Sequence, residues 1–317
     1  MKISIVGAGQ IAPEFLKAAN LVENISFESI CAVNMLDKLK ELQSQYNIGA
    51  IYEDYDQMLD EVESDTVYVA VPNHLHYMMA KKALEKKRNV ILEKPFTITK
   101  KEAEELFELA EKNNVYIFEA ITTMHSPNYK KAKELVKQMP CIKIVYLNYT
   151  QYSSRYDAFK QGEILPAFDY KKAGGALRDI NIYNIHFAVG MFGKPKSVRY
   201  YPNIVNKVDV SGTLMLEYEN FSCVLIGAKD CSNNAEIRIQ GDKQTLLGHS
   251  PANMFASFDF INDREVTNYN LLDHQERLYY EVVEFERVVR EKNTEAYKSY
   301  RDHTLEVMDV VEKAFEK

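Results

Sequence analysis

Two short groups of residues carry side chains suited to acid–base chemistry. Lys94 lies in Glu93-Lys94-Pro95, directly after a β-rich run, and Asp179 and Tyr183 lie four positions apart inside an apolar helical segment. An ammonium group can polarise a carbonyl or promote ionisation of an alcohol, and a phenol can donate or accept a proton. These residue types favour an enzyme whose active site draws on two distant parts of the chain.

The region around Lys94 alternates between strands and helices. Because such alternation generates a parallel sheet covered by helices on both faces, it predicts a Rossmann-type domain over residues 1–120. Thr99 is placed to cap the last helix of this region. The expected strands are Ile3–Val6, Ser29–Val33, Val67–Val71, Val90–Leu92 and Tyr116–Phe118, and the expected helices are Ile11–Asn20, Met35–Tyr46, Leu75–Lys87 and Lys100–Asn113.

A glycine-rich turn follows the first expected strand. Gly7 and Gly9 permit a tight turn and close approach to a pyrophosphate, and Ala12 lets the next helix pack on its strand. Gln10 and Ile11 begin that helix, whose N-terminal N–H groups favour phosphates. The turn predicts dinucleotide binding, and the alternative is a tight turn without a ligand.

The choice between NAD and NADP depends on the end of the second strand. An acidic residue there commonly binds the ribose hydroxyl of NAD, whereas a nearby arginine favours NADP. This chain has Asn34 and Met35, and the amide of Asn34 suits either cofactor. Lys38 and Lys40 tip the expectation towards NADP, although solvation of a helix explains them equally well.

The second half of the chain is expected to form an α+β domain over residues 121–317. After a helix at Tyr129–Gln138, turn sequences such as Gly241-Asp242 and Asn262-Asp263 separate β-rich runs, which predicts a large, mainly antiparallel open sheet. Helices follow at His274–Glu291 and Lys298–Glu316. The expected strands are Ile142–Thr150, Ser197–Tyr201, Val210–Glu217, Phe221–Lys229, Ala235–Gln240, Gln244–Leu247, Phe255–Ile261 and Glu265–Tyr269.

The segment Ala176–Met191 is apolar around most of its helical surface. Asp179, Tyr183 and His186 recur at i, i+4 and i+7, which places them on one face of a helix. A buried carboxylate needs a partner, so the stripe indicates a polar site. For His186 the alternative of a satisfied interior histidine is favoured.

Taken together, these elements resemble the Gfo/Idh/MocA family of nicotinamide-dependent oxidoreductases (glucose-fructose oxidoreductase, inositol dehydrogenase and rhizopine catabolism). The likeness extends over nearly the whole chain. It rests on the N-terminal glycine turn, Pro72-Asn73-x-x-His76, Glu93-Lys94-Pro95, the Gly174-Gly175-x-x-x-Asp179 helix and the final sheet.

The resemblance implies a role for each motif residue. Lys94 would contact the nicotinamide ribose and the reacting substrate oxygen, Tyr183 would be the proton donor or acceptor, and Asp179 would hold substrate hydroxyls or orient the pair. Tyrosine in place of the family's histidine is similar to the dihydrodiol dehydrogenase branch. The residues implied to line the nicotinamide side are Pro72, Asn73, His76 and Glu93. The alternatives are a surface lysine at a strand end and, for His76, a helix-face histidine packed against the sheet.

Two departures from the family pattern bear on the substrate. Asn181 replaces the usual glycine, which would narrow the pocket or alter its hydrogen bonds. The segment Thr123–Pro127 lacks the arginine often found before the family's proline. Substrate identity is therefore less constrained by the resemblance than reaction type.

Composition excludes several classes of protein. The formal net charge of −7 argues against binding to a phosphate backbone. Without a secretory pattern, a bilayer-length apolar run or a Cys/His metal pattern, the chain is expected to be cytoplasmic, to bind no nucleic acid, membrane or metal, and to keep its four cysteines reduced. The open face of the predicted sheet favours a homodimer or higher homo-oligomer.

The function that fits these features is an NAD(P)-dependent oxidoreductase that moves a hydride between nicotinamide and a sugar, polyol or cyclic diol, or the corresponding carbonyl compound. One alternative is a glycosidase that uses NAD in a transient oxidation. A second, from another class, is a catalytically silent dinucleotide sensor that regulates a partner protein.

Overall fold

The computed structural model describes residues 1–316 and divides into two compact units. The first comprises Met1–Ala120 and Glu276–Leu305, and the second comprises Ile121–Gln275 and Glu306–Lys317. The segment 276–305, which the sequence pattern placed in the second domain, thus groups with the first unit. Within residues 1–316, no helix has the length and apolarity needed to cross a bilayer.

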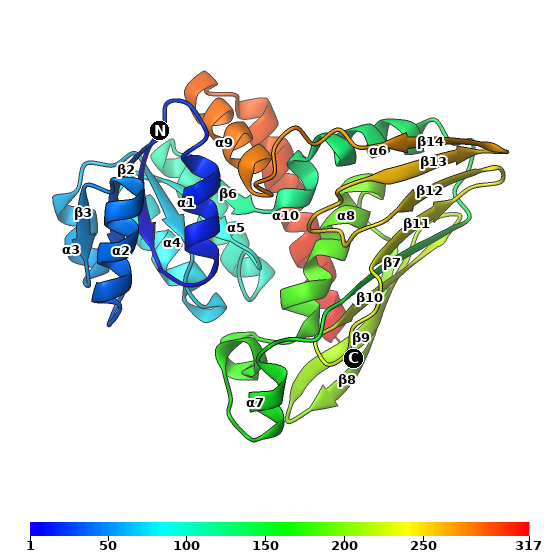
Figure 1. The fold of residues 1–317 in the computed structure, drawn as a ribbon, viewed down its shortest axis with the longest axis horizontal. Helices are drawn as coiled ribbons and strands as arrows, with labels where there is room; N and C mark the ends of the chain where they lie inside the picture. The colour runs from blue at the N-terminus through cyan, green and yellow to red at the C-terminus, as the bar shows by residue number, and fades with distance from the viewer. Residues whose placement is uncertain (317) are drawn as a thin grey trace. The chain divides into compact units, whose positions relative to one another are not determined.

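The first unit is built on a six-stranded parallel sheet (Figure 1). Its strand order is β3-β2-β1-β4-β5-β6, with the first strand at the centre and the later strands extending from both of its sides. The central strands are apolar runs such as Val67–Val69, which are fully buried because helices cover both faces of the sheet. The strands are β1 (Lys2–Val6), β2 (Ser26–Cys31), β3 (Ala50–Tyr52), β4 (Thr66–Val69), β5 (Asn89–Glu93) and β6 (Ile117–Ala120).

The helices of this unit lie where the periodicity predicts, with one addition. They are α1 (Ile11–Ala19), α2 (Leu36–Tyr46), α3 (Tyr55–Glu61), α4 (His76–Glu85), α5 (Lys100–Asn113) and α9 (Tyr279–Glu291). Thr99 caps α5 as predicted, in a capping box with Glu102. The short elements β3 and α3 were not predicted. Asp54 caps α3 by accepting a hydrogen bond from the Gln57 N–H at 3.0 Å.

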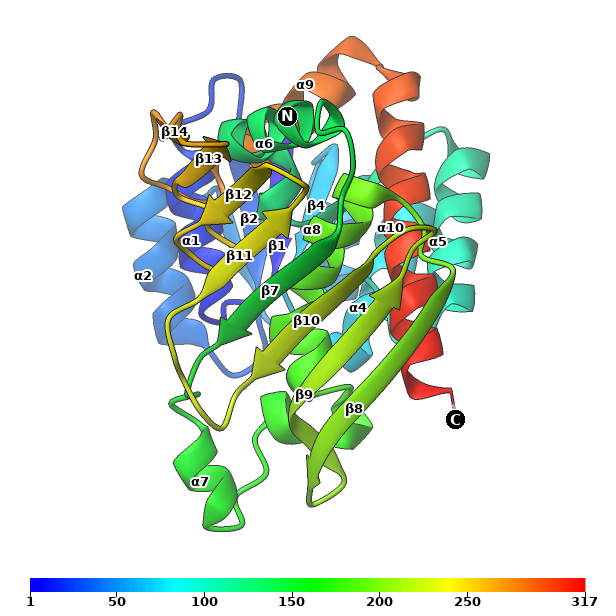
Figure 2. The same cartoon turned by 90° about the vertical axis from the view of Figure 1, so that its right-hand side faces the viewer.

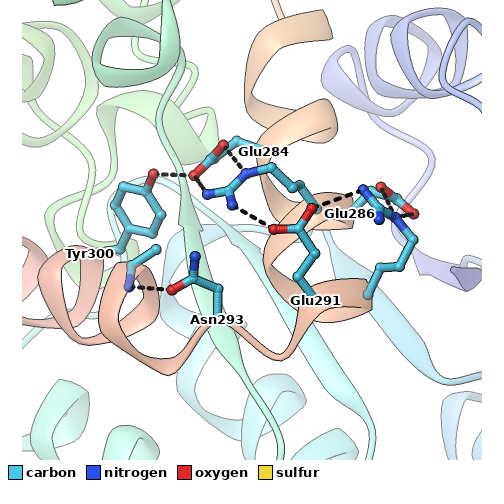
Figure 3. A network of polar contacts seen from close by, with 8 residues as sticks. Glu284, Glu286, Glu291, Asn293 and Tyr300 are labelled. Carbon is cyan, nitrogen blue, oxygen red and sulfur yellow. Dashed lines mark hydrogen bonds and ion pairs between the residues drawn. The ribbon is translucent and has the colours of Figure 1, made fainter.

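A polar network fixes the turn between α9 and α10 (Thr294–Phe315) (Figure 3). Arg287 donates to Glu284 at 2.7 and 3.0 Å and to Glu291 at 2.8 Å. The Tyr300 hydroxyl donates to Glu284 at 2.5 Å, and Asn293 caps α10 by accepting from the Ala296 N–H at 3.0 Å. These contacts hold the C-terminal segment of the first unit as a compact helical pair.

The second unit is built on an eight-stranded sheet with the order β14-β13-β12-β11-β7-β10-β9-β8. Every neighbouring pair is antiparallel except β7 and β10, so the predicted, mainly antiparallel sheet is confirmed. Its strands are β7 (Ile144–Thr150), β8 (Ser197–Val205), β9 (Val208–Glu217), β10 (Ser222–Ala228), β11 (Glu236–Gln240), β12 (Gln244–Gly248), β13 (Phe258–Asn262) and β14 (Glu265–Tyr269).

Helices of the second unit lie on one face of this sheet. Figure 2 shows the strands in front with α8 (Ile182–Phe192) behind them. The core on that side joins buried residues of α8 to Val307, Val310 and Val311 of α10 and to alternate strand residues such as Leu214 and Leu225. The other helices of the unit are α6 (Pro127–Lys137) and the short α7 (Tyr156–Lys160).

Candidate active site

The glycine turn follows β1 and leads into α1. Gly7 has φ of +103°, and a Cβ there would lie 2.1 Å from the Ala70 carbonyl oxygen, so only glycine fits. At Gly9, a Cβ would meet no atom within 4 Å, which leaves open space above the backbone. Gln10 precedes α1, whose first residue is Ile11, and Ala12 is fully buried against the sheet. The turn therefore suits a pyrophosphate lying over Gly9 at the helix N-terminus.

The residues expected at the cofactor ribose follow β2. Asn34 adopts the left-handed conformation, with φ of +57°, and its N–H donates to the Glu53 carboxylate at 3.1 Å. Met35 immediately precedes α2, and Lys38 in α2 pairs with Glu41 at 3.0 Å. Glu53 and Asp54 also line a surface hollow beside this point, together with Leu36, Ile51, Tyr52 and Gln57. Glu53 was not predicted, and it brings a negative charge to the end of β2 where the chain has no acidic residue of its own.

Lys94 follows β5 at the carboxyl edge of the sheet and is partly exposed. The preceding Glu93 is buried and accepts a hydrogen bond from the Tyr68 hydroxyl at 2.6 Å. Burial raises the pKa of Glu93, and the Tyr68 hydroxyl and the Lys94 ammonium oppose that shift. The Lys94-Pro95 peptide bond is cis. Glu93 therefore lies beneath the lysine as an internal anchor.

The C-terminal segment contributes a second buried carboxyl to this unit. Glu281 of α9 is 1% exposed, and burial together with the negative charge of Glu93 raises its pKa well above the usual value. The nearby Arg277 opposes that shift and pairs with Glu14 of α1 at 2.8 Å. These contacts show how residues 276–305 complete the polar interior of the first unit.

His76 is buried at the start of α4, between two loops at the carboxyl edge of the sheet. Its Nδ1 lies 2.8 Å from the Pro95 carbonyl oxygen and its Nε2 lies 2.9 Å from that of Val71. Burial lowers the pKa of His76, and its hydrogen bonds to backbone carbonyls partly oppose that shift. The ring thus joins the loop that carries Pro72 and Asn73 to the loop that carries Lys94. His76 is therefore packed against the sheet, which was the alternative to a cofactor contact. Its two hydrogen bonds help to position these loops.

Asp179 and Tyr183 lie at the start of the buried helical segment in the second unit. Asp179 falls in a π-helical turn, η5 (Leu177–Asn181), and Tyr183 is in the first turn of α8. Such wide turns are rare and occur often at functional sites. The Tyr183 side chain is 7% exposed, and its ring centroid lies 6.0 Å from that of Tyr149. His186 is fully buried in α8.

The start of η5 is held by a buried carboxylate that was not predicted. Asp209 accepts hydrogen bonds from the Leu177 N–H and the Tyr200 hydroxyl, each at 2.7 Å. Burial raises the pKa of Asp209, and these two hydrogen bonds oppose the shift. Gly175 has φ of +128°, and a Cβ there would come within 1.9 Å of Asp209. Gly175 is therefore required for the close approach between this turn and β9.

Asn181 packs against β10. It donates to the Leu225 carbonyl at 3.2 Å and accepts from Asn184 at 2.8 Å. A Cβ on Gly227 of β10 would lie 2.6 Å from the Asn181 Cβ, so the glycine in the strand makes room for the asparagine in the helix. The Asn181 side chain thus bonds the backbone of β10 within the core of the unit, and its effect on a substrate pocket stays a prediction.

Lys229 is a third residue near the proposed site that the sequence pattern missed, after Glu53 and Asp209. It follows β10, its side chain is 2% exposed, and its Nζ lies 2.7 Å from the Asp179 carboxylate. The sequence signal for it was a lysine at the end of an apolar strand, and a solvent-exposed lysine at a strand end has the same pattern. The structure shows that Asp179 has a buried cationic partner within its own unit.

Two family models match most of the chain. A model described as "Oxidoreductase family, NAD-binding Rossmann fold" matches residues 1–121, and one described as "GFO/IDH/MocA C-terminal domain" matches residues 129–247. The chain is 30% identical to a scyllo-inositol 2-dehydrogenase (NADP(+)) of Bacillus subtilis, over 99% of this chain and 96% of that protein. The protein belongs to the Gfo/Idh/MocA oxidoreductase family, and it is an NAD(P)-dependent enzyme.

Other relatives share less sequence. A trans-1,2-dihydrobenzene-1,2-diol dehydrogenase of Xenopus tropicalis is 26% identical over 68% of this chain and 65% of that protein. The crystal structure of a 3-ketoreductase from Actinomadura kijaniata in complex with NADP has a TM-score of 0.81 at 19% identity, over 98% of this chain and 96% of that one. The structural likeness supports the fold described above.

The geometry around Asn34 gives a prediction about cofactor choice. Glu53→Gln should tighten NADPH binding relative to NADH by about three- to tenfold, because an exposed charge near the ribose contributes on the order of 1 kcal/mol. Fluorescence titration with both cofactors measures the ratio, and the difference should shrink at high salt. Glu23→Gln, in the turn before β2, is the matched control. An unchanged ratio would show that Glu53 does not face the ribose.

Proposed function

We propose that this oxidoreductase acts on a sugar, polyol or cyclic diol, or on the corresponding carbonyl compound. The observation that carries this proposal is the full-length similarity to an enzyme named for the oxidation of an inositol. The dihydrodiol dehydrogenase relatives support the cyclic diol as part of the same substrate class. A screen of polyols and aldoses with NAD and NADP, followed through nicotinamide absorbance, tests it.

In the proposed mechanism, Lys94 and Tyr183 act on the same substrate oxygen. The Lys94 ammonium stabilises negative charge as it develops on that oxygen, and the Tyr183 phenol transfers the proton. Asp179 holds a neighbouring hydroxyl of the substrate. A bound nicotinamide supplies or accepts the hydride. Gly7, Gly9, Gln10, Ile11, Asn34 and the loop with Pro72 and Asn73 would hold the cofactor, as the open backbone above Gly9 supports.

Buried anchors support the assignment of Lys94 and Asp179. Glu93 next to the lysine and Lys229 beside the aspartate are both buried ionisable groups, and burial of such groups is costly unless they are partnered. A protein that only sensed a dinucleotide would need the glycine turn without an anchored aspartate in the other unit. Catalysis therefore explains more of the molecule than the sensor does.

The role of Lys94 is tested by its removal. Lys94→Ala should lower kcat by about 100- to 1,000-fold, as the loss of one preorganised electrostatic group does in other enzymes. Cofactor affinity should change far less, because the glycine turn is intact.

Tyr183→Phe should lower kcat by about 100-fold or more through loss of proton transfer.

Lys101→Ala is the matched control for Lys94, since its side chain is 84% exposed on α5. Unchanged turnover in Lys94→Ala would remove the lysine from the mechanism. Product formation without net change in nicotinamide absorbance would instead support the redox glycosidase.

The uncovered face of the second unit's sheet supports a homo-oligomer, and we propose a dimer through it. A row of neighbouring residues crosses five strands on the face opposite the helical core, and it includes Met215, Val224, Tyr146 and Leu247 with Arg238 among them. The four apolar residues are half-buried, and Figure 2 shows this face of β7, β9, β10, β11 and β12 with no helix drawn in front of it. An apolar row of this kind is typical of an interface between subunits.

Light scattering, which measures the molecular mass in solution, tests this proposal. The wild-type protein should have roughly twice the chain mass of 36.6 kDa at micromolar concentration, and Val224→Asp should reduce it to one chain, because it buries a charge at the centre of the row. Leu21→Asp, at an exposed apolar residue of the first unit, should leave the mass unchanged. A monomeric wild-type protein would contradict the proposal.

We also propose a cytoplasmic location. Cys31, Cys141, Cys223 and Cys231 are all free thiols in the structure, which a reducing compartment preserves.

A further inference from the structure

Lys229 has an environment that sets it apart from the surface lysines of this chain. Its backbone is fixed on both sides, since its N–H donates to the Val210 carbonyl at 2.8 Å and its carbonyl accepts from the Ser153 N–H at 2.9 Å. Its side chain is 2% exposed. A lysine is almost never this buried unless it is paired, because removing an ammonium from water is costly.

Three groups of the second unit surround its ammonium. Nζ lies 2.7 Å from the Asp179 carboxylate, donates to the Ala167 carbonyl at 2.6 Å, and lies 4.3 Å from the centre of the Phe168 ring. A cation over an aromatic face is stabilised by the ring's quadrupole. The ammonium therefore joins the end of β10, the short helix η3 (Pro166–Phe168) and the π-helical turn η5.

The same carbonyl also holds the glycine pair. Ala167 accepts a hydrogen bond from the Gly175 N–H at 3.3 Å, and a Cβ on Gly174 would lie 2.8 Å from the Ala167 carbonyl carbon. The Asp179 N–H in turn donates to the Gly175 carbonyl at 3.2 Å. One peptide group thus fixes both the backbone that leads to Asp179 and the lysine that pairs with its side chain.

Asp179 differs from Lys229 in its exposure. Its side chain is 35% exposed, whereas that of the lysine is 2% exposed. The carboxylate consequently has one oxygen on the buried ammonium and a surface that solvent reaches. The ion pair with the buried ammonium holds this carboxylate in a fixed direction.

From this arrangement we infer that Lys229 is a positioning residue for the reaction, which acts by fixing the Asp179 carboxylate towards the substrate's hydroxyl groups. The inference rests on the proposed function of Asp179 as the group that binds those hydroxyls. It assigns no substrate contact to Lys229 itself. Its role resembles that of residues that orient metal or catalytic ligands from behind, whose loss commonly lowers activity by about 10- to 100-fold.

A double-mutant cycle with Lys229→Met and Asp179→Asn tests the inference. Methionine is unbranched like lysine and only one atom shorter, and it removes the charge, so most of the packing of the side chain is preserved. If Lys229 acts through Asp179, Lys229→Met should lower kcat/KM about tenfold or more in the wild-type background and have little further effect in the Asp179→Asn background. Equal losses in both backgrounds would overturn the positioning role.

Thermal unfolding of the same four proteins gives a readout that does not depend on activity. Asp179→Asn leaves a buried ammonium without its carboxylate, so it should lower the melting temperature, and adding Lys229→Met should recover part of that loss. A purely packing role for Lys229 would make the second substitution equally harmful in both backgrounds. That result would overturn the ion pair as the reason for burial of the lysine.

Two further comparisons separate failure of this inference from failure of the proposed function. Lys207→Met removes an exposed lysine that lies over the Tyr170 ring in the same unit, and it should change neither kinetics nor stability. NADPH affinity should be equal in all variants. If the stability cycle shows coupling while Asp179→Asn retains full activity, the ion pair stands, and the proposed role of Asp179 and the positioning role of Lys229 both fail.

Discussion

Two of the three residues proposed for catalysis, Lys94 and Asp179, lie next to a buried polar contact in their own unit. Lys94 follows Glu93, whose carboxyl accepts from Tyr68 inside the first unit. Asp179 is paired with the buried ammonium of Lys229 in the second. Since an unpartnered polar group in the interior is costly, each of these buried groups has essentially one stable arrangement. The more exposed residue next to it, Lys94 or Asp179, is fixed in position as a result.

The two units position their proposed site residues in different ways. In the first, parallel strands bring the glycine turn, Asn34, Pro72 and Lys94 to one edge of the sheet, so that position follows from topology. In the second, position follows from close packing: Gly175 admits Asp209, Gly227 admits Asn181, and the π-helical turn carries Asp179. The family glycine that Asn181 replaces is offset here by a glycine in the strand opposite. The core of the second unit therefore accommodates the larger Asn181 side chain because Gly227 lies opposite it.

Local patterns in the sequence predicted much of this molecule. Thr99 and Glu102 lie within one turn of each other, so the start of α5 could be read directly, and the antiparallel strands followed from their turn residues. The motifs likewise placed Lys94 after a strand and Asp179 near a helix start. Their assignment to one reaction remains a proposal drawn from the family.

What the sequence did not predict depends on contacts between distant segments. Glu53 meets Asn34, and Lys229 meets Asp179, through tertiary packing that periodicity does not encode. The strand β3 has only three half-buried residues, too few for an alternating pattern. The grouping of 276–305 with the first unit has the same cause, because the helical pattern of α9 predicts an apolar face without identifying what that face packs against.

The central claim is that the Lys94 ammonium and the Tyr183 phenol reach one oxygen of the substrate. A crystal structure of the ternary complex, with oxidised cofactor and a polyol that the enzyme accepts, measures this most directly. The account predicts that Lys94 Nζ and Tyr183 Oη both lie about 3 Å from the oxygen on the carbon that faces the nicotinamide. A complex in which the two groups contact different parts of the substrate, or only one contacts it, would contradict the account.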